Sequence, residues 1–155
     1  MKKSFISLFV IGLLCISHIG FAQITFSSDF ECGSMDRAEL VSSDNTNGEE
    51  SYEYNFFSKL DPPNAASPKL APSGRWFYFK MSGIKDKQIT LNFKNTDPLR
   101  CVYSYDNKNW ERFAASEAPE RCKVIKKYEQ DEVYIAYYIP YTYTHLNDKI
   151  NESLE

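Results

Sequence analysis

Few residues in this sequence could carry out chemistry, and histidine is the scarcest of them. The chain has two histidines, His18 and His145, and a histidine-based triad would also need a Ser or Cys nucleophile on a sharp turn. The sequence has no Gly-x-Ser-x-Gly elbow to provide that turn. His145 and Asp148 have the spacing of two zinc ligands, but a zinc site needs a third and a second histidine is missing nearby. We therefore expect His145 to be exposed on a helix surface, and we predict no catalytic and no metal-ligating residue on this chain.

Cysteine is the other reactive side chain, and it occurs at positions 15, 32, 101 and 122. In an exported protein one pair could be oxidised. The candidate pair is Cys101 with Cys122, because they lie in neighbouring predicted strands. The alternative is that the three cysteines after residue 22 are small buried apolar side chains. A zinc site is less favoured than either, because the sequence has no Cys-x-x-Cys spacing.

Residues 1–22 have the outline of a secretory signal peptide. Lys2 and Lys3 precede a nearly uncharged apolar run, and Gly20 and Ala22 provide the small residues that a signal peptidase recognises. We expect cleavage before Gln23 and an exported protein, either periplasmic or secreted. The apolar run is short for a membrane span, so no span is expected after cleavage.

Length, composition and charge limit the classes of function. The chain of 155 residues has the size of one domain and is too short for a large two-domain enzyme. Aromatic residues make up 15% of it, which is typical of a packed globular domain and not of a disordered chain. The net charge is −3 and becomes more negative when Lys2 and Lys3 leave with the signal peptide. The one dense basic run, 123–127, fits a solvated strand or turn, so we predict no nucleic-acid partner.

Alternation of apolar and polar residues predicts strands through most of the chain after residue 22. Ile89, Leu91 and Phe93 alternate with polar residues, which indicates a strand with one buried face. Segments 76–81 and 133–139 are apolar on both faces, so we expect them to be central strands. Weaker strands are expected at 24–27, 37–43, 51–57, 101–105 and 122–128. For residues 23–141 we therefore predict an all-β fold, an antiparallel β-sandwich of about seven to nine strands.

The connections between these strands fit the same plan. Residues 43–48 form a turn by composition, and Asn47-Gly48 is the strongest short signal for a hairpin. Residues 105–110 form a second polar turn. Residues 60–74 include four prolines and show no apolar period, so we expect a long surface loop. Loops of this length in compact domains are often functional.

The sequence changes character after Pro140. Tyr143, Leu146, Ile150 and Leu154 recur at helical spacing, and Thr142 or Thr144 could cap a helix. We expect this helix within residues 142–155 and expect its apolar stripe to need a partner surface, either the sandwich or something absent from the chain. The candidate domain interface is Pro140, Tyr141, Tyr143, Leu146 and Ile150.

Exposed aromatic rings offer a second kind of surface. Trp76 and Trp110, together with several tyrosines, could form a platform on which sugars stack. The favoured alternative is that most of these rings belong to the core, because they lie inside strong predicted strands. A free-standing secreted module that binds carbohydrate or a surface is therefore one hypothesis, and a structural or adhesion domain without a ligand is another.

Four segments together resemble one known family: Phe26 to Ser34, Arg75 to Phe79, Tyr103 to Arg112, and Val133 to Tyr143. In this order and spacing they are similar to the N-terminal β-sandwich domain of the M14 zinc metallocarboxypeptidases, in the cytosolic-carboxypeptidase-like branch. The family usually has Gly-Asn at the early turn, where this sequence has Gly33-Ser34. The resemblance covers nearly all of the chain after residue 22.

The resemblance implies an accessory domain without catalysis of its own. In the family this domain packs against a following α/β carboxypeptidase domain, which holds zinc through a His-x-x-Glu pair and a distant His. None of those residues can be placed on this sequence, so the resemblance implies no cofactor on this chain and zinc in a separate catalytic domain. We expect a gene fragment or a short paralogue that partners a carboxypeptidase catalytic domain, in cis or in trans, and shapes its substrate groove.

Overall fold

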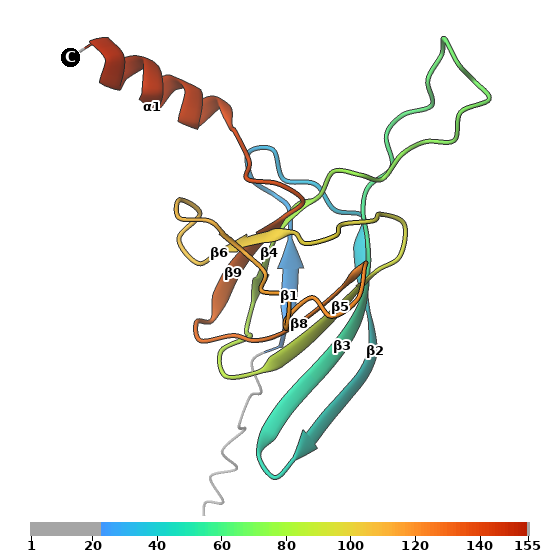
Figure 1. Ribbon diagram of the computed structural model, residues 1–155, viewed down its shortest axis with the longest axis vertical. Coiled ribbons are helices and arrows are strands. Elements are labelled where there is room, and N and C mark those ends of the chain that lie inside the picture. The colour runs from blue at the N-terminus through green and yellow to red at the C-terminus, as the bar shows by residue number, and fades with distance from the viewer. Residues whose placement is uncertain (1–22, 155) are drawn as a thin grey trace, which may run out of the picture.

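The computed structural model describes residues 23–154, in which two β-sheets form a sandwich and one helix follows (Figure 1). The five-stranded sheet has the order β1 (Thr25–Ser27), β4 (Tyr78–Ser82), β9 (Glu132–Ala136), β6 (Val102–Ser104) and β7 (Glu111–Arg112). The four-stranded sheet has the order β2 (Arg37–Thr46), β3 (Glu49–Phe57), β5 (Gln88–Phe93) and β8 (Lys123–Lys127). The helix α1 spans Tyr143–Leu154. The predicted mostly-β fold with a C-terminal helix is confirmed.

The strands with the clearest patterns form where the sequence places them. In β5, Ile89, Leu91 and Phe93 are buried while the intervening residues are at least partly exposed. β4 and β9 pair with each other in the interior of their sheet, as expected for segments that are apolar on both faces. β4 begins at Tyr78, so Trp76 lies before the strand that was expected to include it.

The prediction of a purely antiparallel sandwich is wrong at one pair of strands. β3 and β5 run parallel, from Ser51 opposite Gln88 to Phe56 opposite Phe93. Two parallel neighbours need a crossover connection. Here the long loop and β4, which belongs to the other sheet, provide that connection. Alternation within each strand shows which residues face inward, but it carries no information about strand direction.

The β2–β3 hairpin is longer than predicted and projects from the end of the sandwich opposite to α1 (Figure 1). β2 was expected to end at Ser43 but continues to Thr46, and the turn is reduced to Asn47 and Gly48. Their φ angles of 57° and 82° are both in the left-handed region. This is the geometry that an Asn-Gly pair favours in a two-residue hairpin turn.

Aromatic rings fill the space between the two sheets. Phe56 stacks on Phe79 with ring centroids 4.4 Å apart, and meets Phe77 and Phe93 edge-on at 5.4 Å each. All four side chains are buried. These four phenylalanines form core, but they are not among the rings considered for an aromatic platform. Of that set Tyr78 is buried and Trp110 is half-buried, whereas Trp76, Tyr138, Tyr141 and Tyr143 are exposed. The favoured alternative, that most of the platform rings belong to the core, is not confirmed.

The three cysteines in the described residues are free thiols. Cys101 is buried, Cys122 is half-buried and Cys32 is exposed. Cys101 precedes β6 and Cys122 precedes β8, in opposite sheets, and the candidate bridge between them is not formed in the structure. Burial raises the pKa of the Cys101 thiol to about 12, so Cys101 behaves here as a small apolar side chain.

Residues 1–22, for which a signal peptide is predicted, lie outside the described residues. Within residues 23–154, no helix combines the length and apolarity that a membrane crossing requires.

Candidate functional site

The start of α1 is fixed by two polar contacts, one local and one distant. Thr142 is the cap, since its hydroxyl accepts a hydrogen bond from the His145 amide at 3.2 Å. One of the two predicted capping residues is therefore confirmed. The Thr144 amide donates to Glu31 Oε1 at 3.1 Å, which ties the helix to the connection between β1 and β2. Hydrogen bonds from Thr144 lower the pKa of the Glu31 carboxyl, as expected for a carboxylate at a helix N-terminus.

The apolar stripe of α1 faces solvent. Leu146 and Ile150 are 40% and 47% exposed, and Leu154 is more exposed still. All α1 side chains are exposed or half-buried. The segment leading into the helix adds further exposed apolar side chains, and we call the whole set the helix surface: Tyr138, Ile139, Tyr141, Tyr143, Leu146, Ile150 and Leu154.

The residues predicted for a domain interface separate into two groups. Pro140 is buried, because the chain turns there from β9 toward α1. Tyr141, Tyr143, Leu146 and Ile150 are exposed and belong to the helix surface. The structure therefore places four of the five predicted residues where a partner could reach them, and their role as an interface stays a prediction.

A cavity of about 700 Å³ lies beside this surface, between α1 and the sandwich. Its aromatic wall comprises Phe30, Tyr78 and Trp110, with ring centroids of Phe30 and Trp110 at 4.8 Å and 5.8 Å from that of Tyr78. The Tyr78 hydroxyl is hydrogen-bonded to the side-chain oxygen of Asn107. The Trp110 indole N–H is buried and has no hydrogen-bond partner among the described residues. The opposite wall comes from α1 and includes His145 and Asp148.

Trp76 and Trp110 do not form one flat platform. Each meets the Tyr78 ring edge-on, at 6.4 Å and 5.8 Å. Trp76 is 37% exposed and its indole N–H donates to the Cys32 carbonyl at 3.3 Å, while Trp110 is half-buried. Tyr78 itself is buried, so sugar stacking could use only the outer edges of this cluster. The aromatic surface stays a prediction.

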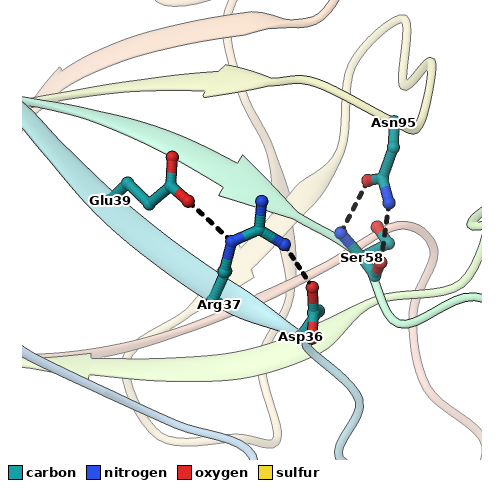
Figure 2. A network of polar contacts seen from close by, with 5 residues as sticks. All are labelled: Asp36, Arg37, Glu39, Ser58 and Asn95. Carbon is teal, nitrogen blue, oxygen red and sulfur yellow. Dashed lines mark hydrogen bonds and ion pairs between the residues drawn. The ribbon is translucent and has the colours of Figure 1, made fainter.

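A second concave site lies at the end of the long loop that was expected to be functional. It is a polar cleft of about 500 Å³ lined by residues 71–75 and 94–97. The cleft is held at its base by Asn95, whose side chain bonds both the amide and the carbonyl of Ser58 at 2.8 Å each (Figure 2). The loop and α1 leave the sandwich at the same end (Figure 1).

The part of the chain that the structure describes contains no recognisable metal site. Residues 23–154 contain no group of three or more His, Cys, Asp or Glu side chains placed to hold a metal ion. His145 is half-buried, and its ring lies 6.4 Å from that of Tyr141.

Three of the residues that build these sites, Phe30, Glu31 and Asn95, were not singled out from the sequence. Glu31 and Thr144 are 113 positions apart, so no local pattern could connect them. Phe30 was part of the N-terminal segment that carried the family resemblance, but nothing indicated that its ring would line a cavity. Asn95 lies two residues after the end of β5, and a polar residue near a strand end is too common to predict this pair of hydrogen bonds.

Comparison with known proteins identifies the sandwich. The sequence pattern of one family, described as the cytosolic carboxypeptidase N-terminal domain, matches residues 26–138. No curated protein matches the chain.

Solved structures with the same fold are longer carboxypeptidases. A metallo-carboxypeptidase from Burkholderia cenocepacia is 18% identical with a TM-score of 0.56, over 84% of this chain and 32% of its own. A metallo-carboxypeptidase from Pseudomonas aeruginosa, in complex with (2-guanidinoethylmercapto)succinic acid, is 17% identical with a TM-score of 0.55, over 84% and 33%. This chain spans about a third of the length of the solved structures it matches.

Proposed function

Because this chain belongs to the family of cytosolic carboxypeptidase N-terminal domains, we propose that it is a non-catalytic accessory domain of an M14-type carboxypeptidase. It packs against a catalytic domain, in cis or in trans, and shapes the substrate groove of that domain. The chain corresponds to about a third of each carboxypeptidase structure that it matches, and in this proposal the remaining part supplies the chemistry.

The observation that carries the proposal is the exposed helix surface. Seven large apolar side chains lie between positions 138 and 154, and each is at least 40% exposed. Monomeric proteins expose single apolar residues routinely, but contiguous apolar patches of this kind mark interaction sites. The helix begins at Tyr143, shortly after the end of the region that matches the family at residue 138, which is where a following domain would make contact.

Zinc, in this proposal, belongs to the catalytic domain. Only one of the two histidines of the sequence, His145, falls within the described residues. Its half-buried ring is near Tyr141 and is not grouped with other possible ligands in the described part of the chain. The accessory domain would act by covering one side of the groove and by stabilising its partner, not by binding the metal.

The test of this proposal is complex formation with a defined partner. The purified chain is mixed in equal amounts with a carboxypeptidase catalytic domain from the same organism, and molar mass is measured by light scattering after size exclusion. We expect a 1:1 complex. Separate elution of the two proteins at micromolar concentrations would contradict packing in trans. Packing in cis would then be tested by the same measurement, together with limited proteolysis, on a single chain that joins both domains.

Export is a further part of the proposal and rests on the composition of residues 1–22. Cell fractionation followed by N-terminal sequencing tests it. Recovery of a chain that begins at Gln23 outside the cytoplasm would support export, and recovery of the uncleaved chain in the cytoplasm would contradict it.

A carbohydrate-binding or surface-binding module is the alternative function, and the exposure of Trp76, Tyr138 and Tyr141 favours it. Glycan-array binding that disappears in Trp110→Ala without loss of folding would support this alternative. Absence of glycan binding by the folded chain would contradict it.

A further inference from the structure

We propose that the polar cleft lined by residues 71–75 and 94–97 binds an oxyanion, that is, a carboxylate or phosphate group. This site is separate from the helix surface, and the inference does not depend on the proposed accessory function. Three features of the cleft support it: an excess of unpaired positive charge, a buried hydroxyl group without a partner among the described residues, and walls that are fixed in place.

Positive charge in the cleft is not neutralised by the protein. Arg75 and Lys94 both line it, and neither has an ion-pair partner among residues 23–154. The one carboxylate in the lining, Asp97, is already bound by Arg121, whose Nη2 lies 2.8 Å from Asp97 Oδ2. In a chain with net charge −3, two unpaired cations at one cleft form a local electrostatic site for an anion.

A buried hydroxyl group in the lining of the cleft has no hydrogen-bond partner among the described residues. Thr96 lines the cleft and is only 9% exposed, and its Oγ1 has no partner among the described residues. Ser58 Oγ, in a residue bound to Asn95 through its backbone but outside the cleft lining, is also buried without a partner among the described residues. Buried polar groups in native proteins are almost always paired, so an unpaired hydroxyl in a cleft indicates a missing partner.

The walls of the cleft are held against each other before any ligand arrives. The two hydrogen bonds between Asn95 and Ser58 join the end of β5 to the end of β3 (Figure 2). The Asp61 amide donates to the Ser73 carbonyl at 2.8 Å and closes the base of the long loop. A Cβ placed on Gly74 would lie 3.0 Å from the Asn95 carbonyl oxygen, so the two walls touch and leave no room for a side chain there. A site fixed in this way loses little conformational freedom on binding.

The chemistry of these groups selects an oxyanion over other small ligands. The planar guanidinium of Arg75 presents paired donors that match the oxygens of a carboxylate or a phosphate. Lys94 adds a point charge, and the Thr96 hydroxyl can donate a third hydrogen bond. A cationic ligand would meet two unpaired positive charges and only one carboxylate, which is already paired.

The test is an amide NMR titration of the purified chain with sodium phosphate and, in a separate arm, with sodium glutarate. Both are measured against sodium chloride at equal ionic strength. We expect saturable chemical-shift changes of the Gly74, Asn95 and Thr96 amides with at least one of the two anions. The anion that binds more tightly identifies the kind of oxyanion. Shifts that do not saturate, or that sodium chloride reproduces in full, would overturn the proposal.

Variants separate a built site from general charge attraction. The double variant Arg75→Gln, Lys94→Gln should bind at least tenfold more weakly, while Lys108→Gln, which removes a cation lining the other cavity, should bind as the unchanged chain does. Thr96→Val should weaken binding without lowering the melting temperature, because it removes a hydroxyl that has no partner in the free protein. An equal loss of affinity in Lys108→Gln, or full affinity in the double variant with an unchanged amide spectrum elsewhere, would refute the site.

Discussion

Removal of two apolar side chains from α1 should weaken binding to a catalytic domain while leaving the accessory domain folded. Full burial of a Leu or Ile side chain contributes about 1.5–3 kcal/mol. Leu146 and Ile150 are already partly covered, being 40% and 47% exposed. A partner that covers the rest therefore gains about 0.6–1.2 kcal/mol at Leu146 and about 0.7–1.4 kcal/mol at Ile150.

The double variant Leu146→Ala, Ile150→Ala should accordingly lose about 1.3–2.6 kcal/mol of binding free energy, which is about a 10- to 80-fold higher Kd. By the same scale, loss of the parts of these side chains that are already covered lowers the free energy of unfolding of the accessory domain itself by at most about 1.7–3.4 kcal/mol, so its folding is checked in parallel. Alanine is also a strong helix former, so α1 should persist.

Isothermal titration calorimetry with the catalytic domain measures the Kd, and urea unfolding measures the stability. Leu40→Ala is the control, since Leu40 is 56% exposed on β2, where it pairs with Tyr54 of β3 and is not part of the helix surface. An unchanged Kd in the double variant, or an equal loss in Leu40→Ala, would refute the assignment of the helix surface as the interface.

Three further predictions concern the fold itself. Phe56→Ala should lower the free energy of unfolding by about 3–5 kcal/mol in urea denaturation, because Phe56 is fully buried among three other rings; a loss below 1 kcal/mol would contradict the placement of the core. Gly48→Ala should cost about 1 kcal/mol by the same assay, because φ at Gly48 is +82° and disfavours a Cβ, whereas an unchanged midpoint would show that the turn adopts another shape. Backbone and side-chain hydrogen bonds from Asn109 hold the pKa of Asp106 far below its usual range. A carboxyl group whose pKa is lowered by folding stabilises the fold at pH values above its unfolded-state pKa, and this stabilisation is lost as the pH falls. Asp106→Asn should therefore flatten the decline of stability below about pH 5. An identical acid profile in both proteins would refute this.

The sequence was most informative where one local rule acts alone. Alternation placed β5 correctly, and the Asn47-Gly48 pair located the hairpin turn, because backbone geometry at those positions depends on the residues themselves. The helical spacing and the Thr142 cap likewise identified α1.

Features that depend on distant parts of the chain could not be predicted in this way. The parallel pairing of β3 with β5 follows from the route of the chain through the other sheet. β7 has only two residues, Glu111 and Arg112, and forms because β6 offers an edge to pair with. β2 runs past its predicted end because Asp44 and Asn45, poor strand formers, are held by pairing with β3.

The candidate sites show the same division. The exposed apolar stripe of α1 could be predicted from residue spacing, whereas the contact of Glu31 with Thr144 and the polar cleft could not. Arg75 and Lys94 are 19 positions apart in the printed sequence, and nothing local indicates that both lie at one cleft beside a buried Thr96 hydroxyl. Both sites depend on loops that the sandwich brings together at one end.

The most direct test of an accessory role without catalysis is an assay of C-terminal amino-acid release by the purified chain alone, with zinc added and a set of peptides as substrates. We predict release no greater than in the blank without protein, and the same result for His145→Ala. Release that follows the chain through purification and is lost in His145→Ala would contradict the proposal.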